Sequence, residues 1–254
     1  MLLQVALVAA EGLLLFVLSR ALFGWVLQAF ASRNSRRRGG WLLQLIRLPG
    51  NLVHELSHAL AFLVTGYTVK RVVPCLWDRS GAGVCQPGRP WSPIAVPWLA
   101  TGLAALAPLF TGAVALYAVA HLLDVPLEAH LSLREPGRSV LHSIYGSLLL
   151  LDYSSWRTWL FLYLAFTIGA ELAPSRTDLA LGIPALLALG LATTLFLLAT
   201  YQLDPEAPFR VVVLTNAYQG LTALARLLGI ALVTTGLVTA LTFLPAALIR
   251  AARG

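Results

Sequence analysis

The stretch Pro49-Gly50-Asn51-Leu52-Val53-His54-Glu55-Leu56-Ser57-His58-Ala59-Leu60 carries three ionisable side chains within five residues of an otherwise apolar segment. On an α-helix, positions i and i+4 project from the same face, so His54 and His58 would point the same way, one turn apart. Ionisable groups inside a bilayer are costly and usually mark functional sites. This stretch therefore predicts a helix that carries a chemical site within a membrane protein.

The composition of the chain excludes an ordinary water-soluble fold. Of its 254 residues, 58% are hydrophobic and 11% are charged, whereas a soluble domain has about 25% charged residues. We therefore predict an all-α integral membrane protein with the lipid bilayer as a partner. The net charge of +7 is spread over short loops and chain ends. That distribution is typical of anchoring at lipid head groups, and we expect no binding of nucleic acid.

Apolar runs of about 20 residues predict a bundle of about six transmembrane helices, and residues 1–254 are expected to form a single polytopic membrane domain. Two further apolar stretches, Ser139–Leu151 and Val211–Ala225, are too short to span and are expected at the interface or as re-entrant segments. The predicted spans are Met1–Phe30, Trp41–Gly66, Trp91–Leu123, Trp156–Leu172, Leu179–Leu203 and Leu227–Ile249.

Basic residues leave the orientation of the bundle open. The cluster Arg33–Arg38 favours a cytoplasmic first loop, and Arg250 and Arg253 favour a cytoplasmic C-terminus. Five predicted spans separate the two groups, and an odd number of spans cannot place both on the same side.

Between the second and third predicted spans the sequence changes to the pattern of a β-hairpin. Tyr67–Val73 is rich in β-branched residues, Ser80–Gly83 can form a turn, and Val84–Gln86 can return as a second strand. Cys75 and Cys85 flank the tip and form either a disulfide or two free thiols. The edge near Tyr67–Val73 is a candidate for holding an extended substrate by strand addition.

The His-Glu-x-x-His spacing indicates a zinc site. Two histidines one helical turn apart can bind one Zn²⁺, and Glu55 can reach a water molecule beside the metal without being a ligand. Zinc polarises a carbonyl group and lowers the pKa of its water toward about 7. The alternative is that these side chains only pack within the bundle, but the apolar setting favours the metal site.

Turn signals on both sides predict the limits of the motif's helix. Pro49-Gly50 interrupts the apolar run, and Asn51 can act as an N-cap. We therefore predict a helix over about Leu52–Val64 that ends near Gly66.

A catalytic zinc site usually has three protein ligands and an open position, so a third ligand is needed. Asp178 lies at the start of an uncharged span, which suits a ligand. Ser175-x-x-Asp178 also resembles a helix-capping pattern, and the spacing leaves ligand and cap both open. Glu171, seven residues earlier, is a candidate for supporting a ligand. Weaker candidates are Glu11, His121, His130, His142, Asp152 and Asp204.

The segment Pro49–Leu60, followed by Thr65-Gly66, resembles the zinc helix of the site-2 protease family of intramembrane metallopeptidases. By position, His54 and His58 match the zinc histidines and Glu55 the catalytic glutamate. The resemblance implies a helical core, zinc held by two histidines and a later aspartate, and transmembrane segments as substrates.

The later aspartate matches that family less closely. The family's Leu-Asp-Gly motif, preceded by Asn and Pro, is absent. The segment Pro174-Ser175-x-x-Asp178 is similar to one in smaller bacterial membrane proteins of the same broad class. That similarity implies Asp178 as the third zinc ligand and a bacterial cell membrane as the location.

Other functions compatible with the sequence are a non-catalytic zinc-binding membrane scaffold or regulatory protein, a transporter, and a zinc hydrolase acting on lipid or prenylated peptide. Transporters often show internal symmetry, and none is visible here. The sequence leaves the oligomeric state and the substrate open.

Overall fold

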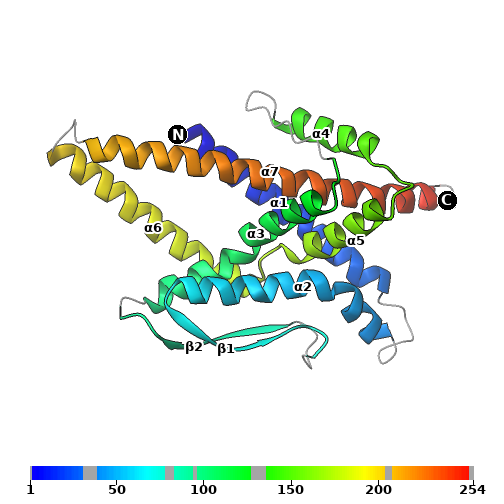
Figure 1. Ribbon diagram of the computed structural model, residues 1–254, viewed down its shortest axis with the longest axis horizontal. Helices are drawn as coiled ribbons and strands as arrows, with labels where there is room; N and C mark the ends of the chain where they lie inside the picture. Colours follow the sequence, from blue (N-terminus) through cyan, green and yellow to red (C-terminus); the bar gives the residue numbers. More distant parts are fainter. Residues whose placement is uncertain are drawn as a thin grey trace.

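The computed structural model of the chain describes residues 2–30, 39–77, 83–93, 96–126, 136–203 and 208–251. It is mostly helical, with one two-stranded sheet (Figure 1). The Arg33–Arg38 cluster, the tip of the predicted hairpin at 78–82, and the residues His130, Asp204 and Arg253 lie outside the described residues. The elements are α1 (Leu2–Phe30), α2 (Gly39–Val64), β1 (Tyr67–Val73), β2 (Val84–Pro90), α3 (Pro97–Leu122), α4 (Pro136–Leu150), α5 (Trp156–Glu171), α6 (Arg176–Leu203) and α7 (Pro208–Ala251).

Within the described residues, three helices are long and apolar enough to cross a membrane: Pro97–Leu122, Thr177–Gln202 and Val212–Leu241. This finding supports a membrane protein but does not support about six spans. Helix α5 has 16 residues and is about 24 Å long, short of the roughly 30 Å of bilayer hydrocarbon. Helix α2 carries Pro49 and the ionisable motif.

Both short apolar stretches lie in helices that are longer than the stretches themselves. Ser139–Leu151 falls almost entirely within α4. Val211–Ala225 is continuous with Leu227–Ile249 in α7, a helix of 44 residues. The prediction of a separate interfacial or re-entrant segment at Val211–Ala225 was therefore wrong. The run contains no proline between Pro208 and Pro245, so no proline forces the helix to end there.

Helix α2 packs against α3 and α5, and the hairpin packs against α2. Figure 1 shows the hairpin along the side of α2 that faces away from α6 and α7. Helix α3 also contacts α5, α6 and α7, so it connects the α2 side of the molecule to the rest. The apolar core includes Leu15 of α1, Leu116 of α3, Phe161 of α5 and Leu232 of α7, each at most 1% exposed.

Helix α2 begins at Gly39 and continues through Pro49, which corrects the predicted start at Leu52 and the N-cap role of Asn51. The reason lies in the packing against α5, because a Cβ on Gly50 would lie 2.0 Å from the carbonyl oxygen of Thr167. The close approach requires glycine inside the helix rather than at a break. The predicted end is confirmed, with Val64 as the last helical residue and Gly66 at φ +91°.

The predicted hairpin is confirmed. Strands β1 and β2 are antiparallel, with Val73 opposite Val84 and Tyr67 opposite Pro90, and register shifts occur on both sides of Val69. Cys75 and Cys85 are free thiols rather than a disulfide. Cys75 is fully buried, and its sulfur lies 3.6 Å from the carbonyl oxygen of Gln44 in α2.

Candidate metal centre

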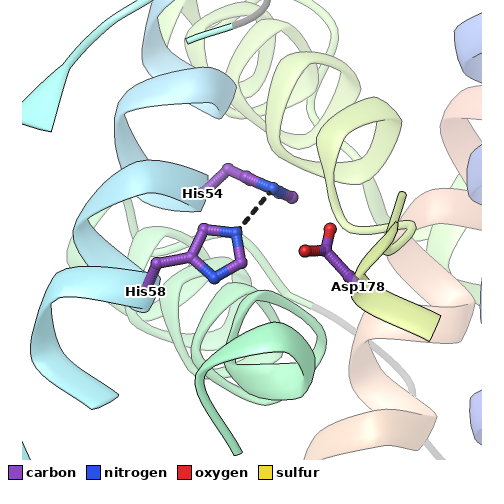
Figure 2. A group of neighbouring side chains, drawn as sticks. All are labelled: His54, His58 and Asp178. Carbon is purple, nitrogen blue, oxygen red and sulfur yellow. Dashed lines mark hydrogen bonds between the residues drawn. The ribbon is translucent and has the colours of Figure 1, made fainter. Parts of the chain in front are cut away.

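The fold brings together the three residues that the sequence indicated as metal ligands. His54 and His58 extend from one face of α2, and Asp178 lies in the first turn of α6 (Figure 2). One potential ligand atom from each residue lies within 4.8 Å of the other two. Among the described residues, this group of three could hold a metal ion.

Backbone carbonyl groups fix the tautomer of both histidines. His54 Nδ1 lies 2.7 Å from the carbonyl oxygen of Glu171, and His58 Nδ1 lies 2.7 Å from that of Ala104. A carbonyl oxygen can only accept a hydrogen bond, so each Nδ1 carries the proton and donates it. Each Nε2 is then left with a lone pair, which is the form of imidazole that binds a metal.

The two Nε2 atoms face each other at 3.1 Å, across the contact drawn in Figure 2. With both protons on Nδ1, neither Nε2 atom can donate to the other, and two lone pairs at this distance repel. A cation that accepts both lone pairs, with the nearby Asp178 carboxylate, removes the repulsion. This geometry suits a pair of metal ligands better than a pair joined by a hydrogen bond.

Asp178 makes the helix-capping contacts that the sequence suggested and also lies beside the histidine pair. Its Oδ2 accepts a hydrogen bond from the Ser175 backbone N–H at 2.8 Å. The Asp178 N–H donates in return to the Ser175 hydroxyl at 3.1 Å, which is a reciprocal capping arrangement. A carboxylate has a second oxygen, so capping through Oδ2 fixes the side chain and leaves Oδ1 for a metal.

Glu55 lies beside this group and is closely covered by the hairpin. Its side chain is 4% exposed, and Asn51, one turn earlier, is fully buried. The Asn51 Oδ1 accepts the Cys75 backbone N–H at 2.7 Å. Gly83, at φ +84°, leads into β2, and a Cβ there would lie 2.6 Å from Glu55 Oε1 and 2.8 Å from the Asn51 amide. Only glycine lets the returning strand pass this close to the carboxylate.

A cavity of about 470 Å³ adjoins the site. Its walls include the three candidate ligands and Glu55, together with residues of α3 and of β2. The hairpin residues in this wall are Val84, Cys85 and Pro87 of β2. The sequence suggested the edge of β1 as a substrate contact, whereas the structure places β2 at the cavity.

Glu171 supports the site in two ways, as its sequence position suggested. Its backbone carbonyl holds His54, and its carboxylate pairs with Arg47 of α2 at 2.6 Å. The two side chains are 9% and 11% exposed, so the ion pair is largely removed from solvent. Sequence reasoning missed Arg47, because nothing local connects it to a residue 124 positions away.

The remaining candidates do not join the group. His121, His142 and Asp152 are exposed; His121 stacks on Tyr117, and Asp152 accepts hydrogen bonds from Ser154. The residues that sequence reasoning missed, apart from Arg47, are Gly83 and Ala104. Their contributions are a backbone conformation and a backbone carbonyl, which residue type does not reveal.

Comparisons of the chain with models of protein families, with curated proteins and with solved structures find no match. The geometry described above is therefore the basis for assigning a function.

Proposed function

We propose that this chain is an intramembrane zinc metallopeptidase, similar to site-2 proteases, that hydrolyses peptide bonds in or near transmembrane segments of membrane proteins. We further propose that it is a multi-pass protein of a bacterial cell membrane. The main support for the proposed metal centre is that the Nε2 atoms of the two histidines lie 3.1 Å apart with their lone pairs facing. Asp178 and the buried Glu55 lie beside them.

The donor set fits zinc better than other common metals. Two imidazoles and one carboxylate suit Zn²⁺, whereas Mg²⁺ and Ca²⁺ prefer oxygen ligands alone. With Zn–N bonds of about 2.0–2.1 Å, two nitrogens of a tetrahedral site lie roughly 3.3 Å apart, close to the separation here. When bound, Zn²⁺ would polarise the carbonyl of the substrate and make a water molecule acidic enough to attack at neutral pH.

Glu55 would act as the general base and then as the acid. As the water oxygen bonds to the carbonyl carbon, its proton passes to the Glu55 carboxylate. As the carbon–nitrogen bond breaks, Glu55 gives that proton to the departing amine. Its position next to His54 in sequence and in the cavity wall suits both transfers.

The shape of the site favours a substrate in extended conformation. A cavity bordered by β2 offers strand backbone beside the candidate ligands. A substrate that is helical in the membrane must be unwound locally, because helical carbonyls are already hydrogen-bonded. Asp178 lies in the first turn of α6, and α6 is a candidate span, so we propose that the segment to be cut approaches from the bilayer side of α6.

Zinc content and cleavage test this proposal separately. Elemental mass spectrometry of detergent-purified protein should find close to one zinc per chain, and almost none for His54→Ala. Glu55→Gln should keep the zinc and lose hydrolysis, because Glu55 is not a ligand. Cleavage can be followed on solubilised membrane proteins of the expression host, by mass spectrometry of new N-termini with parent and Glu55→Gln side by side.

Two results would overturn the proposal in different ways. Parent protein that takes up no zinc, even after reconstitution, would exclude the metal centre and favour a transporter or scaffold. Zinc-loaded parent that produces no more new N-termini than Glu55→Gln would favour a non-catalytic zinc-binding scaffold or regulatory protein.

A further inference from the structure

Pro108 lies inside helix α3, four residues after Ala104. In an α-helix the N–H of residue i donates to the carbonyl of residue i−4. Proline has no N–H, so Pro108 leaves the Ala104 carbonyl without its helical donor. That carbonyl is the one that accepts the proton of His58 Nδ1 at 2.7 Å. Ala104 is 1% exposed, so water does not satisfy it.

The end of α5 likewise offers a backbone carbonyl without its helical donor to the other histidine, His54. Helix α5 ends at Glu171, and Pro174 follows. In a continued helix the Ser175 N–H would donate to the Glu171 carbonyl. Instead, the carbonyl accepts from His54 Nδ1 and the Ser175 N–H donates to Asp178 Oδ2. The carbonyl and the N–H that would have formed this helical bond therefore each contact a candidate metal ligand, His54 and Asp178 respectively.

We propose that Pro108 is a positioning residue of the metal centre, because it leaves the Ala104 carbonyl free to fix the proton of His58 on Nδ1. This inference rests on the metal centre of the proposed function and not on hydrolysis. A merely structural proline would kink or pack α3 without any effect on the tautomer of His58. The two roles therefore predict different results when the proline is replaced.

Pro108→Ala restores an N–H that competes with His58 for the Ala104 carbonyl. Alanine is far more favourable than proline in a helix interior, so α3 itself should not weaken. Loss of a hydrogen bond that orients a metal-binding histidine typically costs 10–100-fold in metal affinity. We expect a zinc dissociation constant raised by about 10–100-fold in a protein whose thermal unfolding temperature is equal or higher.

The experiment measures Zn²⁺ binding to the full chain in detergent, by competition with a chelator, for the parent and Pro108→Ala. Pro184→Ala is the matched control, because Pro184 is also inside a helix of the bundle, in α6, but is exposed. It should leave the zinc affinity unchanged. Equal affinity of Pro108→Ala and the parent would overturn the proposal.

A spectroscopic measurement covers the case in which Pro108→Ala does not fold. Nitrogen-15 NMR of labelled histidines in metal-free parent protein, at alkaline pH, reports the tautomer of each neutral imidazole. The expected result for His58 is a protonated Nδ1 and an unprotonated Nε2. A predominantly Nε2-protonated His58 would overturn the proposal in the parent itself.

The outcome also separates this inference from the proposed function. Parent protein that binds no zinc excludes the metal centre, and both fall together. Parent protein that binds zinc, with the variant binding it equally well, removes only the role of Pro108.

Discussion

The site side of the bundle, formed by α1, α2, α3 and α5, differs from the α6–α7 arm, formed by residues 186–203 of α6 and 211–218 of α7, in the contacts that its side chains make. On the site side, polar groups bond across helices. Ser19 of α1 donates to the Gly169 carbonyl of α5, and Thr111 of α3 donates to Ser57 of α2. Arg47 of α2 pairs with Glu171 of α5, as described above.

In the arm, two threonine hydroxyl groups bond to their own helix and large apolar side chains face outward. Thr193 and Thr194 donate to carbonyls one turn earlier in α6. Leu187 is 69% exposed, Leu191 61% and Val212 57%. Figure 1 shows α6 extending away from α2 and α3 at an angle. In water such a surface would be costly, whereas lipid tails are as apolar as leucine.

The difference between the two regions shows where the structure depends on particular residues. Lipid offers no hydrogen-bonding groups, so every polar group in it needs a partner within the protein. In the arm, Thr193 and Thr194 meet that requirement within their own helix, and many apolar sequences would do so. On the site side several polar groups have specific long-range partners, and there single substitutions should have the largest effects.

The largest expected effect is that of Arg47→Met. The substitution leaves the Glu171 carboxylate buried without the partner at 2.6 Å, which costs about 3–5 kcal/mol in known buried pairs. Thermal unfolding in detergent should show the loss as a markedly lower midpoint.

The double variant Arg47→Met, Glu171→Leu is the matched control. Replacing both charges with apolar groups of similar size is often neutral or stabilising, so it should recover most of the stability. If the double variant unfolds as early as Arg47→Met, the ion pair is not the source of the loss.

A smaller effect is expected from adding one methyl group to a glycine in each region. Gly50→Ala places a Cβ 2.0 Å from the Thr167 carbonyl oxygen, so α2 and α5 must separate, at about 1–3 kcal/mol for overpacking. Gly190→Ala in the arm meets nothing within 4 Å and should be neutral or stabilising by up to about 1 kcal/mol.

Unfolding midpoints of both variants, compared with the parent, measure this contrast. Equal destabilisation by the two substitutions would mean that the arm is packed against another chain, and the comparison between the regions would fail.

The facing of the two histidines could be predicted from the sequence because it depends on local spacing. His54 and His58 are one helical turn apart, and their facing follows from helix geometry alone. Asp178 was found by its position at the start of a span. Its spacing left cap and ligand both open, and the similarity of Pro174-Ser175-x-x-Asp178 to other membrane proteins favoured the ligand. The structure shows the cap, and the second carboxylate oxygen remains for the proposed role as a ligand.

The supporting groups could not be predicted because they depend on how distant helices meet. Pro108 can be seen in the sequence, but the sequence does not show that His58 bonds to the carbonyl that Pro108 leaves free.

Pro49-Gly50 predicted a helix start at Leu52 by rules that hold in water. In membrane helices such residues are tolerated, because neighbouring helices satisfy the freed backbone groups, and Gly50 is needed for the contact with α5. The predicted count of six spans relied on apolar length, which cannot distinguish a buried short helix such as α5 from a span.

The smallest effect concerns the hairpin over Glu55. Burial and, to a smaller extent, the negative charge of Glu55 raise the pKa of the Cys85 thiol to about 11. Because the thiolate is the nucleophile, alkylation of Cys85 should be slow near neutral pH and should accelerate as the pH rises toward that value. Glu55→Gln removes the like charge and lowers the Cys85 pKa, so alkylation below pH 11 should become a few-fold faster.

The measurement is the rate of iodoacetamide labelling in metal-free protein, on a Cys75→Ala background so that only Cys85 reacts. Glu11→Gln is the matched control, because Glu11 does not contribute to the Cys85 shift, and its rate should equal that of the parent. If Glu55→Gln and Glu11→Gln label alike, Glu55 does not face Cys85 and β2 does not border the metal centre. A faster rate for Glu55→Gln alone places the returning strand beside the proposed general base, where an extended substrate would have to lie.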